Sequence, residues 1–310
     1  MGERRTDPIF GGETPLVFAH RGGRLEVAES TPLAFDHALR VARADVLEID
    51  VQRTADGTLV VWHGPSLENV RIDVRCIDDR PARREPWQND VTLVDWRKLA
   101  GRAWVSDPRP SYDDVSDVPD EAARRMLTLA EFLDLYPGAA VNVEVKTENF
   151  GEEHVGTLLD VLHAGRGGRM ILVVSASRSL LQAYRRLAQE RFPSERHPTG
   201  LAASEVLAAR AASSLPFVGV RRMRDRALQS THHSFLTPAS LIRDVQAREG
   251  AAHVFVTGFY RLPALDAKAG HPTRDELLPV LRRGVDGIMT DRPAQVRPLV
   301  DEWKRTQAGA

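Results

Sequence analysis

The chain is poor in cysteine and contains no long apolar run. Its single cysteine, Cys76, excludes a disulfide within the chain and leaves no cysteine cluster for zinc. No stretch of about 18 apolar residues is present, so we expect no transmembrane helix. The first residues, MGERRTDPIFGGETP, lack the apolar segment of a signal peptide, which favours a cytoplasmic protein.

Neither sign of charge is in excess. The 42 Lys and Arg residues against 43 Asp and Glu residues give a net charge of -1, so we expect no binding to nucleic acid or to an anionic membrane surface. Lysine is scarce, because nearly all of the basic residues are arginine. A lysine retained in a chain with this preference for arginine is a candidate for a chemical role. The four lysines are Lys98, Lys146, Lys268 and Lys304. The 310 residues, 42% of them hydrophobic, suit a globular protein with a sizeable core.

Apolar strand patterns alternate with helical patterns along the chain. Strands are predicted at 16–20, 46–51, 58–62, 140–146, 170–175, 200–204, 215–220, 227–231, 252–259 and 286–291, and helices at 31–43, 179–190, 237–250 and 273–284. This alternation is typical of the α/β class, with parallel strands joined by helices. About eight such strands in 300 residues favour a closed TIM (β/α)8 barrel. An open doubly wound sheet is the alternative, although no glycine-rich dinucleotide motif follows the first strand.

One segment, 64–126, interrupts the alternation. It is rich in Asp, Arg and Pro and has one short helical pattern, at 94–100. A structureless loop of that length is unusual in a compact domain. We therefore expect a single domain over 1–310, in which 64–126 forms a small inserted subdomain after the second strand and covers one mouth of the barrel.

Two of the predicted strands carry charge on one face. Side chains alternate along a strand, so Glu48 and Asp50 share a face of 46–51, and Glu144 and Lys146 share a face of 140–146. Parallel strands covered by helices normally form continuous apolar runs. Edge strands with one solvated face would explain the pattern in an antiparallel sheet. In a barrel, charge on the inner face indicates a site near the strand ends.

These carboxylates predict a cation site. Three converging carboxylates need a compensating charge where water is scarce. Oxygen ligands favour Mg2+ or Ca2+ over zinc. We therefore predict one divalent cation held by Glu48, Asp50 and Glu144. Lys146 either offsets part of the negative charge or binds an anionic oxygen of the substrate.

Two histidines lie at the ends of two other predicted strands. His20 ends the first strand and His63 follows 58–62, and an imidazole can act as acid or base near neutral pH. Arg21 offers a fork suited to phosphate, and Gly22-Gly23 lets the backbone approach an anion. Together with a hard cation, this set suits attack at phosphorus.

The remaining histidines are weaker candidates. For the pair His232-His233 a surface turn is the simpler interpretation. Five others are interpreted as structural: His37, His154, His163, His253 and His271.

Four motifs, in order, resemble those of glycerophosphodiester phosphodiesterases. HRGGRLEVAEST resembles the HRG…PENT signature, LEIDVQRTADGTLVVWHGPSL the E-x-D…DG…V-x-H-D segment, VNVEVK the N-x-E-x-K strand, and GVDGIMTDRP the C-terminal strand and turn. These matches span residues 16 to 293. The resemblance implies a TIM barrel with an insertion after its second strand. It also implies hydrolysis of a small phosphodiester, such as glycerophosphocholine, to glycerol 3-phosphate and an alcohol.

The resemblance also implies a role for each site residue. By this likeness His20 and His63 are the acid/base pair, Glu48, Asp50 and Glu144 the metal ligands, and Arg21 and Lys146 the phosphate contacts. In the family's route the glycerol hydroxyl of the substrate attacks phosphorus, and water then opens the cyclic phosphate.

Three stretches depart from the family pattern. Ala28-Glu29-Ser30-Thr31 replaces Pro-Glu-Asn-Thr, His63-Gly64 replaces His-Asp, and Phe255-Val256-Thr257-Gly258 replaces Trp-Thr-Val-Asn. Two other functions stay open: a phosphodiesterase acting on another substrate such as a lysophospholipid, and a non-catalytic binding protein. The sequence predicts neither the head group nor the oligomeric state.

Overall fold

The structure is a computed structural model that describes residues 9–10, 14–64, 72–73, 91–98, 100–101, 122–201, 205, 224–231, 237–256 and 274–308. Its strands are β1 Leu16–His20, β2 Val46–Arg53, β3 Leu59–Val61, β4 Ile72–Asp73, β5 Ala100–Gly101, β6 Ala140–Val145, β7 Ile171–Val174, β8 Thr199–Gly200, β9 Arg226–Thr231, β10 Ala251–Val256 and β11 Gly287–Thr290. Its helices are α1 Pro32–Asp36, α2 Leu93–Trp96, α3 Leu129–Leu135, α4 Val155–Ala164, α5 Arg178–Arg191, α7 Ala239–Ala247, α8 Arg274–Leu281 and α9 Pro293–Ala308. A π-helical turn, η1 His37–Val41, and two 3-10 turns, η4 Ala122–Arg124 and η5 Glu152–His154, complete the described elements.

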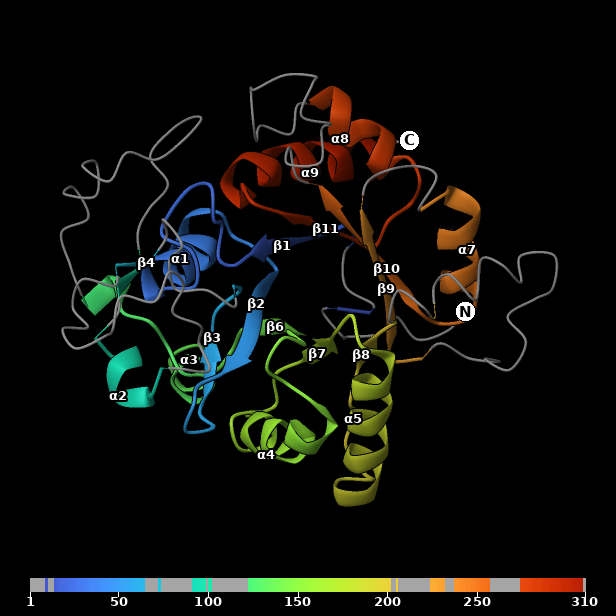
Figure 1. Cartoon of the computed structure of the whole chain (residues 1–310). Coiled ribbons are helices and arrows are strands. Elements are labelled where there is room, and N and C mark those ends of the chain that lie inside the picture. The colour runs from blue at the N-terminus through green and yellow to red at the C-terminus, as the bar shows by residue number, and fades with distance from the viewer. Residues whose placement is uncertain are drawn as a thin grey trace, which may run out of the picture.

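The strands form a closed barrel. Neighbouring strands follow the order β1-β11-β10-β9-β8-β7-β6-β2, and β1 also pairs with β2, which closes the ring. All eight strands run parallel, and helices lie around the outside of the ring (Figure 1). The predicted TIM barrel is therefore confirmed, and the open doubly wound sheet is wrong. The chain also forms a hairpin, in which β3 pairs antiparallel with β2 after a turn at Gly57 (φ +84°).

The first helix begins as its sequence predicts. The Thr31 side chain accepts a hydrogen bond from the Ala34 backbone N–H at 3.3 Å, and Pro32 occupies the first helical position, where no N–H is needed. The helix continues through the π-helical turn to Val41, close to the predicted span of 31–43.

Alternation along the strands separates two cores. Outward-facing side chains such as Leu47, Ile49 and Val141 are buried beneath the surrounding helices. An apolar cluster fills the interior of the barrel, mostly toward the N-terminal ends of the strands, and we call this layer the barrel floor. The barrel floor consists of Ile9, Leu16, Phe18, Val46, Ala140, Leu172, Val174, Ala227 and Met289. Above it, Gln229 donates a hydrogen bond to Asn142 Oδ1 across the interior at 2.7 Å.

Parts of the inserted segment are attached to the barrel. Trp96 of α2 is fully buried and donates from Nε1 to the Leu127 carbonyl at 3.3 Å. It packs in a small apolar cluster that includes Val60 and Trp62 near β3. The short strands β4 and β5 pair with each other and not with the barrel. The rest of 64–126 lies outside the described residues, so an inserted subdomain over the mouth stays a prediction, as does the strand at 215–220.

Candidate active site

Charged side chains gather at the carboxyl ends of β1, β2 and β6. The register places His20 of β1 beside Glu48 of β2, and Asp50 of β2 beside Glu144 of β6. These residues continue the inward face that forms the barrel floor nearer the N-terminal end. We call this layer the charged rim. The charged rim consists of His20, Arg21, Glu48, Asp50, Glu144, Lys146 and Asp291.

Glu48 and Asp50 are fully buried yet have opposite pKa shifts. Burial raises the pKa of Glu48 well above its usual range, and the charges of Asp50 and Glu144 add to the rise. Burial acts on Asp50 in the same direction, but Lys146 and Arg21 outweigh it and hold the Asp50 pKa below its usual range. Asp50 is therefore the ionised member of the pair, while Glu48 needs a further positive charge to stay ionised.

Lys146 lies between two carboxylates. Its Nζ is 2.8 Å from Asp50 Oδ1 and 2.6 Å from Glu144 Oε1. Burial would lower the Lys146 pKa, but these two acids outweigh it and raise the pKa. The pKa of Glu144 is raised by burial and by Asp50. These two ion pairs offset negative charge, and contact between Lys146 and a substrate oxygen stays a prediction.

Arg21 is also engaged by carboxylates. Its Nε lies 2.9 Å from Asp50 Oδ2 and one terminal nitrogen lies 3.3 Å from Glu29 Oε1, while its backbone N–H donates to Glu48 Oε2 at 2.9 Å. Arg21 adopts a left-handed backbone (φ +52°) and begins a tight turn that continues through Gly22 (φ +81°). A Cβ on Gly22 would lie 2.6 Å from Ala34 Cβ, so the turn packs directly on α1 and requires glycine.

His20 is enclosed by protein groups. Its Nδ1 lies 2.5 Å from Asp291 Oδ1, its Nε2 lies 3.8 Å from Glu48 Oε2, and the Phe255 ring meets it nearly edge-on with centroids 4.5 Å apart. Burial, followed by the nearby Arg21 charge, lowers the His20 pKa to about 4. The ring is therefore neutral near pH 7.

His63 has a different environment. Its backbone carbonyl accepts a hydrogen bond from Gln52 Nε2 at 2.7 Å, which fixes the chain where β3 ends. Burial lowers the His63 pKa to about 3, against an opposing effect of Asp50. In the described part of the chain, its ring has no carboxylate partner comparable to the one that Asp291 gives His20. This agrees with Gly64 standing where an acid would follow the histidine.

The residues fit a divalent cation. His20, Glu48 and Asp50 each offer a ligand atom, and these atoms lie within 4.8 Å of one another. Glu48 Oε1 is buried and has no hydrogen-bond partner among the described residues. A buried carboxylate oxygen without a hydrogen bond is available to coordinate a cation. Glu144 is not in this group and lies beside Lys146 instead. The structure therefore brings two of the three predicted carboxylate ligands together and adds His20.

The charge balance of the site also favours a divalent cation. Among the described residues, the carboxylates here are Glu29, Glu48, Asp50, Glu144 and Asp291, and the basic side chains are Arg21, Arg24 and Lys146. With both histidines neutral, the excess of negative charge equals the charge of one divalent cation. A single ion would therefore neutralise the cluster.

Sequence reasoning missed four residues of this site. Asp291 contacts His20, and Arg24 Nε lies 2.7 Å from the same Asp291 oxygen. Glu29 holds Arg21, and Phe255 packs on His20. The available signal was position, because Asp291 directly follows the last strand and that strand must pair with the first to close a barrel. The pair His232-His233 and residues Thr257-Gly258 lie outside the described residues.

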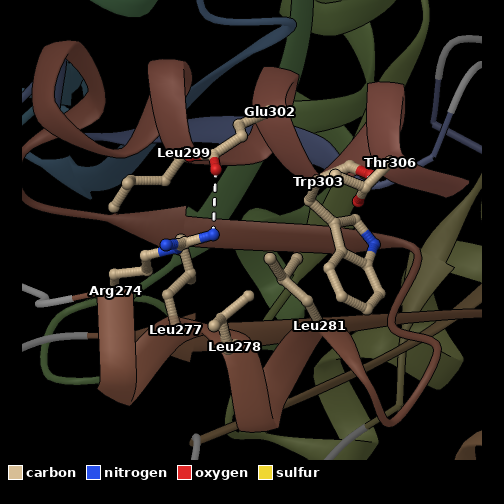
Figure 2. Close-up of a pocket in the computed structure, with 8 residues that line it drawn as sticks. All are labelled: Arg274, Leu277, Leu278, Leu281, Leu299, Glu302, Trp303 and Thr306. Carbon is tan, nitrogen blue, oxygen red and sulfur yellow. Dashed lines mark hydrogen bonds and ion pairs between the residues drawn. The ribbon is translucent and has the colours of Figure 1, made fainter.

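A pocket lies on the outside of the barrel, between α8 and α9 (Figure 2). Leu277, Leu281 and Trp303 line it, and Arg274 closes one side through an ion pair with Glu302 at 2.9 Å. It shares no residue with the charged rim and contains no pair of groups suited to proton transfer. The candidate site is therefore the rim. In the described part of the chain, every helix is too short or too polar to cross a membrane.

Comparison with known proteins agrees with this geometry. Residues 20–295 match the model of the glycerophosphoryl diester phosphodiesterase family. A glycerophosphodiester phosphodiesterase of Bacillus subtilis is 31% identical over 134 residues, which are 43% of this chain and 40% of that protein. A human lysophospholipase D is 29% identical over 138 residues, 42% of this chain and 36% of that protein. The chain thus spans less than half the length of these two relatives.

The fold has solved counterparts. A phosphodiesterase of Oleispira antarctica, solved in complex with the product sn-glycerol-3-phosphate, superposes with a TM-score of 0.64. The alignment covers 93% of this chain and 97% of that one at 18% identity. At this identity the likeness supports the fold alone.

Proposed function

Because the chain belongs to the glycerophosphoryl diester phosphodiesterase family, we propose that it hydrolyses a glycerophosphodiester to glycerol 3-phosphate and an alcohol. The observation that carries this proposal is the meeting of Glu48, Asp50 and His20 at the carboxyl end of a parallel barrel, with Arg21 and Lys146 in contact with the same carboxylates. Active sites of such barrels lie at this end.

We propose that Glu48 and Asp50, with Glu144 completing the set, hold one Mg2+ or Ca2+ ion. The bound ion would polarise the phosphoryl oxygens and offset the charge that develops on them. The orphaned Glu48 oxygen and the excess of carboxylates support this assignment. Arg21 and Lys146 would contact the phosphate from beside the carboxylates that hold them now.

We assign proton transfer to His20 and His63. One neutral imidazole takes the proton from the glycerol hydroxyl of the substrate as that oxygen attacks phosphorus. The other must carry a proton once the anionic substrate is bound, and gives it to the departing alcohol oxygen. Water then opens the cyclic phosphate, with the two roles exchanged. Their neutral state near pH 7 supports a base at one of these positions. His20 ends β1 and His63 follows β3, so the two histidines come to the acidic cluster from different strands. An acid and a base that act on opposite sides of one phosphorus need such separate positions.

A lysophospholipid is the second candidate substrate. The similarity to a human lysophospholipase D favours it. A lysophospholipid has the same reacting phosphodiester as a glycerophosphodiester and differs from it by an acyl chain on the glycerol. We also propose that residues 1–310 form one domain, with 64–126 inserted over the mouth.

The experiment uses purified protein with glycerophosphocholine, glycerophosphoethanolamine and lysophosphatidylcholine. Each is incubated with Mg2+, Ca2+ or EDTA, and His20→Ala is assayed in parallel. We expect glycerol 3-phosphate from the first two substrates, only with a divalent cation, and at least about 10²-fold less from His20→Ala. Faster cleavage of lysophosphatidylcholine would select the second substrate. No release from any of the three would contradict catalysis and favour a binding protein.

A further inference from the structure

The His20 ring is held on three sides, and each contact constrains a different part of it. Asp291 Oδ1 meets Nδ1 at 2.5 Å, and Phe255 packs edge-on at an interplanar angle of 87°. Nε2 is left facing Glu48 Oε2, 3.8 Å away. The two ring nitrogens are therefore not equivalent, because one is committed to a carboxylate and the other faces the acidic cluster.

Asp291 reaches His20 through closure of the barrel. β1 and β11 pair with Ala19 opposite Thr290, so His20, which ends β1, and Asp291, which directly follows β11, meet just beyond the pairing. Asp291 is only 2% exposed. The pairing of the first and last strands therefore brings this carboxylate to His20.

Arg24 contacts the same carboxylate as His20. Its Nε lies 2.7 Å from Asp291 Oδ1, the oxygen that His20 also contacts. The turn after β1 places Arg24 there, because the N–H groups of Gly23 and Arg24 both donate to the His20 carbonyl, at 2.9 and 3.3 Å. One short segment thus supplies both the histidine and the arginine that orients its carboxylate.

We propose that Asp291, held by Arg24, is the positioning residue of His20. The carboxylate accepts the Nδ1–H, which fixes the tautomer in which Nε2 carries a lone pair and faces Glu48. When Nε2 takes a proton, the imidazolium forms next to an existing negative charge, and Asp291 itself takes no proton. The effect on rate rests on the proposed phosphodiesterase activity, whereas the tautomer does not.

The kinetic test is Asp291→Asn. An amide keeps the shape of the carboxylate but can donate to Nδ1, which favours the wrong tautomer. We expect kcat to fall about 10²- to 10⁴-fold with KM changed less than about threefold, and Asp291→Glu to recover part of the loss. The matched control is Asp286→Asn, at the opposite end of β11, where the carboxylate accepts hydrogen bonds from the Ala252 N–H (2.8 Å) and Gln246. Its kcat should stay within about twofold of wild type.

The second readout does not depend on activity. Nitrogen NMR of histidine-labelled protein reports the tautomer of each ring, and the His20 signals are assigned by their loss in His20→Ala. We expect Nδ1–H at His20 in the wild type and a shift toward Nε2–H in Asp291→Asn. If the wild type cleaves none of the three substrates, the proposed function fails while this spectrum still tests Asp291. An Nε2–H tautomer in the wild type, or an Asp291→Asn variant with wild-type kcat, would overturn the proposal.

Discussion

The barrel floor and the charged rim lie on the same face of the same strands and differ in almost every physical respect. On β1, Phe18 belongs to the floor and His20 to the rim, and on β2 the same step separates Val46 from Glu48. The floor gains free energy by removing apolar surface from water. The rim buries carboxylates, one of which has a strongly raised pKa. Two residues along a strand therefore separate an apolar layer from the charged layer to which we assign the proposed chemistry.

The largest effect is expected in the rim, from Asp50→Asn. Asp50 is the acid that both Arg21 and Lys146 contact, so its loss removes a cation ligand and releases two basic side chains. We predict that kcat/KM for glycerophosphocholine falls about 10³-fold. The control is Asp36→Asn, whose partly exposed carboxylate pairs only weakly with Arg40 at 3.8 Å. A variant at position 50 that kept a tenth of the activity would contradict the assignment.

In the floor, Phe18→Ala should act on stability. The ring is fully buried and packs against His253, with centroids 4.5 Å apart. We predict a loss of about 3–5 kcal/mol in the free energy of unfolding, measured with denaturant. Leu135→Ala, at a side chain that is 45% exposed, should cost less than about 0.5 kcal/mol. Equal losses at the two positions would show that the floor does not carry the stability.

Stabilisation by a divalent cation should distinguish variants of the charged rim from variants of the barrel floor. At about 100 times its Kd, an ion that binds only the folded protein raises the free energy of unfolding by about 2.7 kcal/mol. We predict this increase for wild type and for Phe18→Ala, but not for Glu48→Gln. The measurement is denaturant unfolding with and without the ion. An undiminished increase in Glu48→Gln would place the ion elsewhere.

The smallest predicted effect is a pH dependence from His253, which packs against Phe18 of the floor. Burial lowers the pKa of His253 to about 4, against about 6.5 in an unfolded chain. As pH falls from about 6.5 toward 4, the unfolded chain binds a proton that the folded protein excludes, so stability is lost with falling pH. Between pH 7 and 5, wild type should lose about 2 kcal/mol more than His253→Leu. Parallel pH profiles for the two proteins would show that His253 is not the cause.

The sequence predicted the rim because charge interrupts an apolar alternation. Glu48, Asp50 and Glu144 stand out in the amino-acid sequence as acids on one face of a strand, and the alternation of strands and helices predicts the barrel. The floor is visible only in part, since inward and outward apolar side chains look alike in a strand that is buried on both sides.

The contacts within the rim could not be predicted in this way. Asp291 meets His20 across 271 positions of sequence because the last strand pairs with the first. Arg21 turns back onto Glu29 and Asp50 because its backbone is left-handed, a conformation that local sequence does not specify for arginine. The contacts of His20 and Arg21 therefore depend on the pairing of β1 with β11 and on the turn at Arg21. Both form only in the folded chain.

One measurement tests the central claim most directly. The rate of glycerol 3-phosphate release from glycerophosphocholine is followed in one preparation before EDTA, after EDTA and after a divalent cation is restored, with Glu48→Gln treated alongside. The account predicts that wild-type release stops with EDTA and returns with the cation, and that folded Glu48→Gln releases no product at any stage. Release that continues in EDTA, or a Glu48→Gln variant as active as wild type, would contradict a cation-dependent site at the rim.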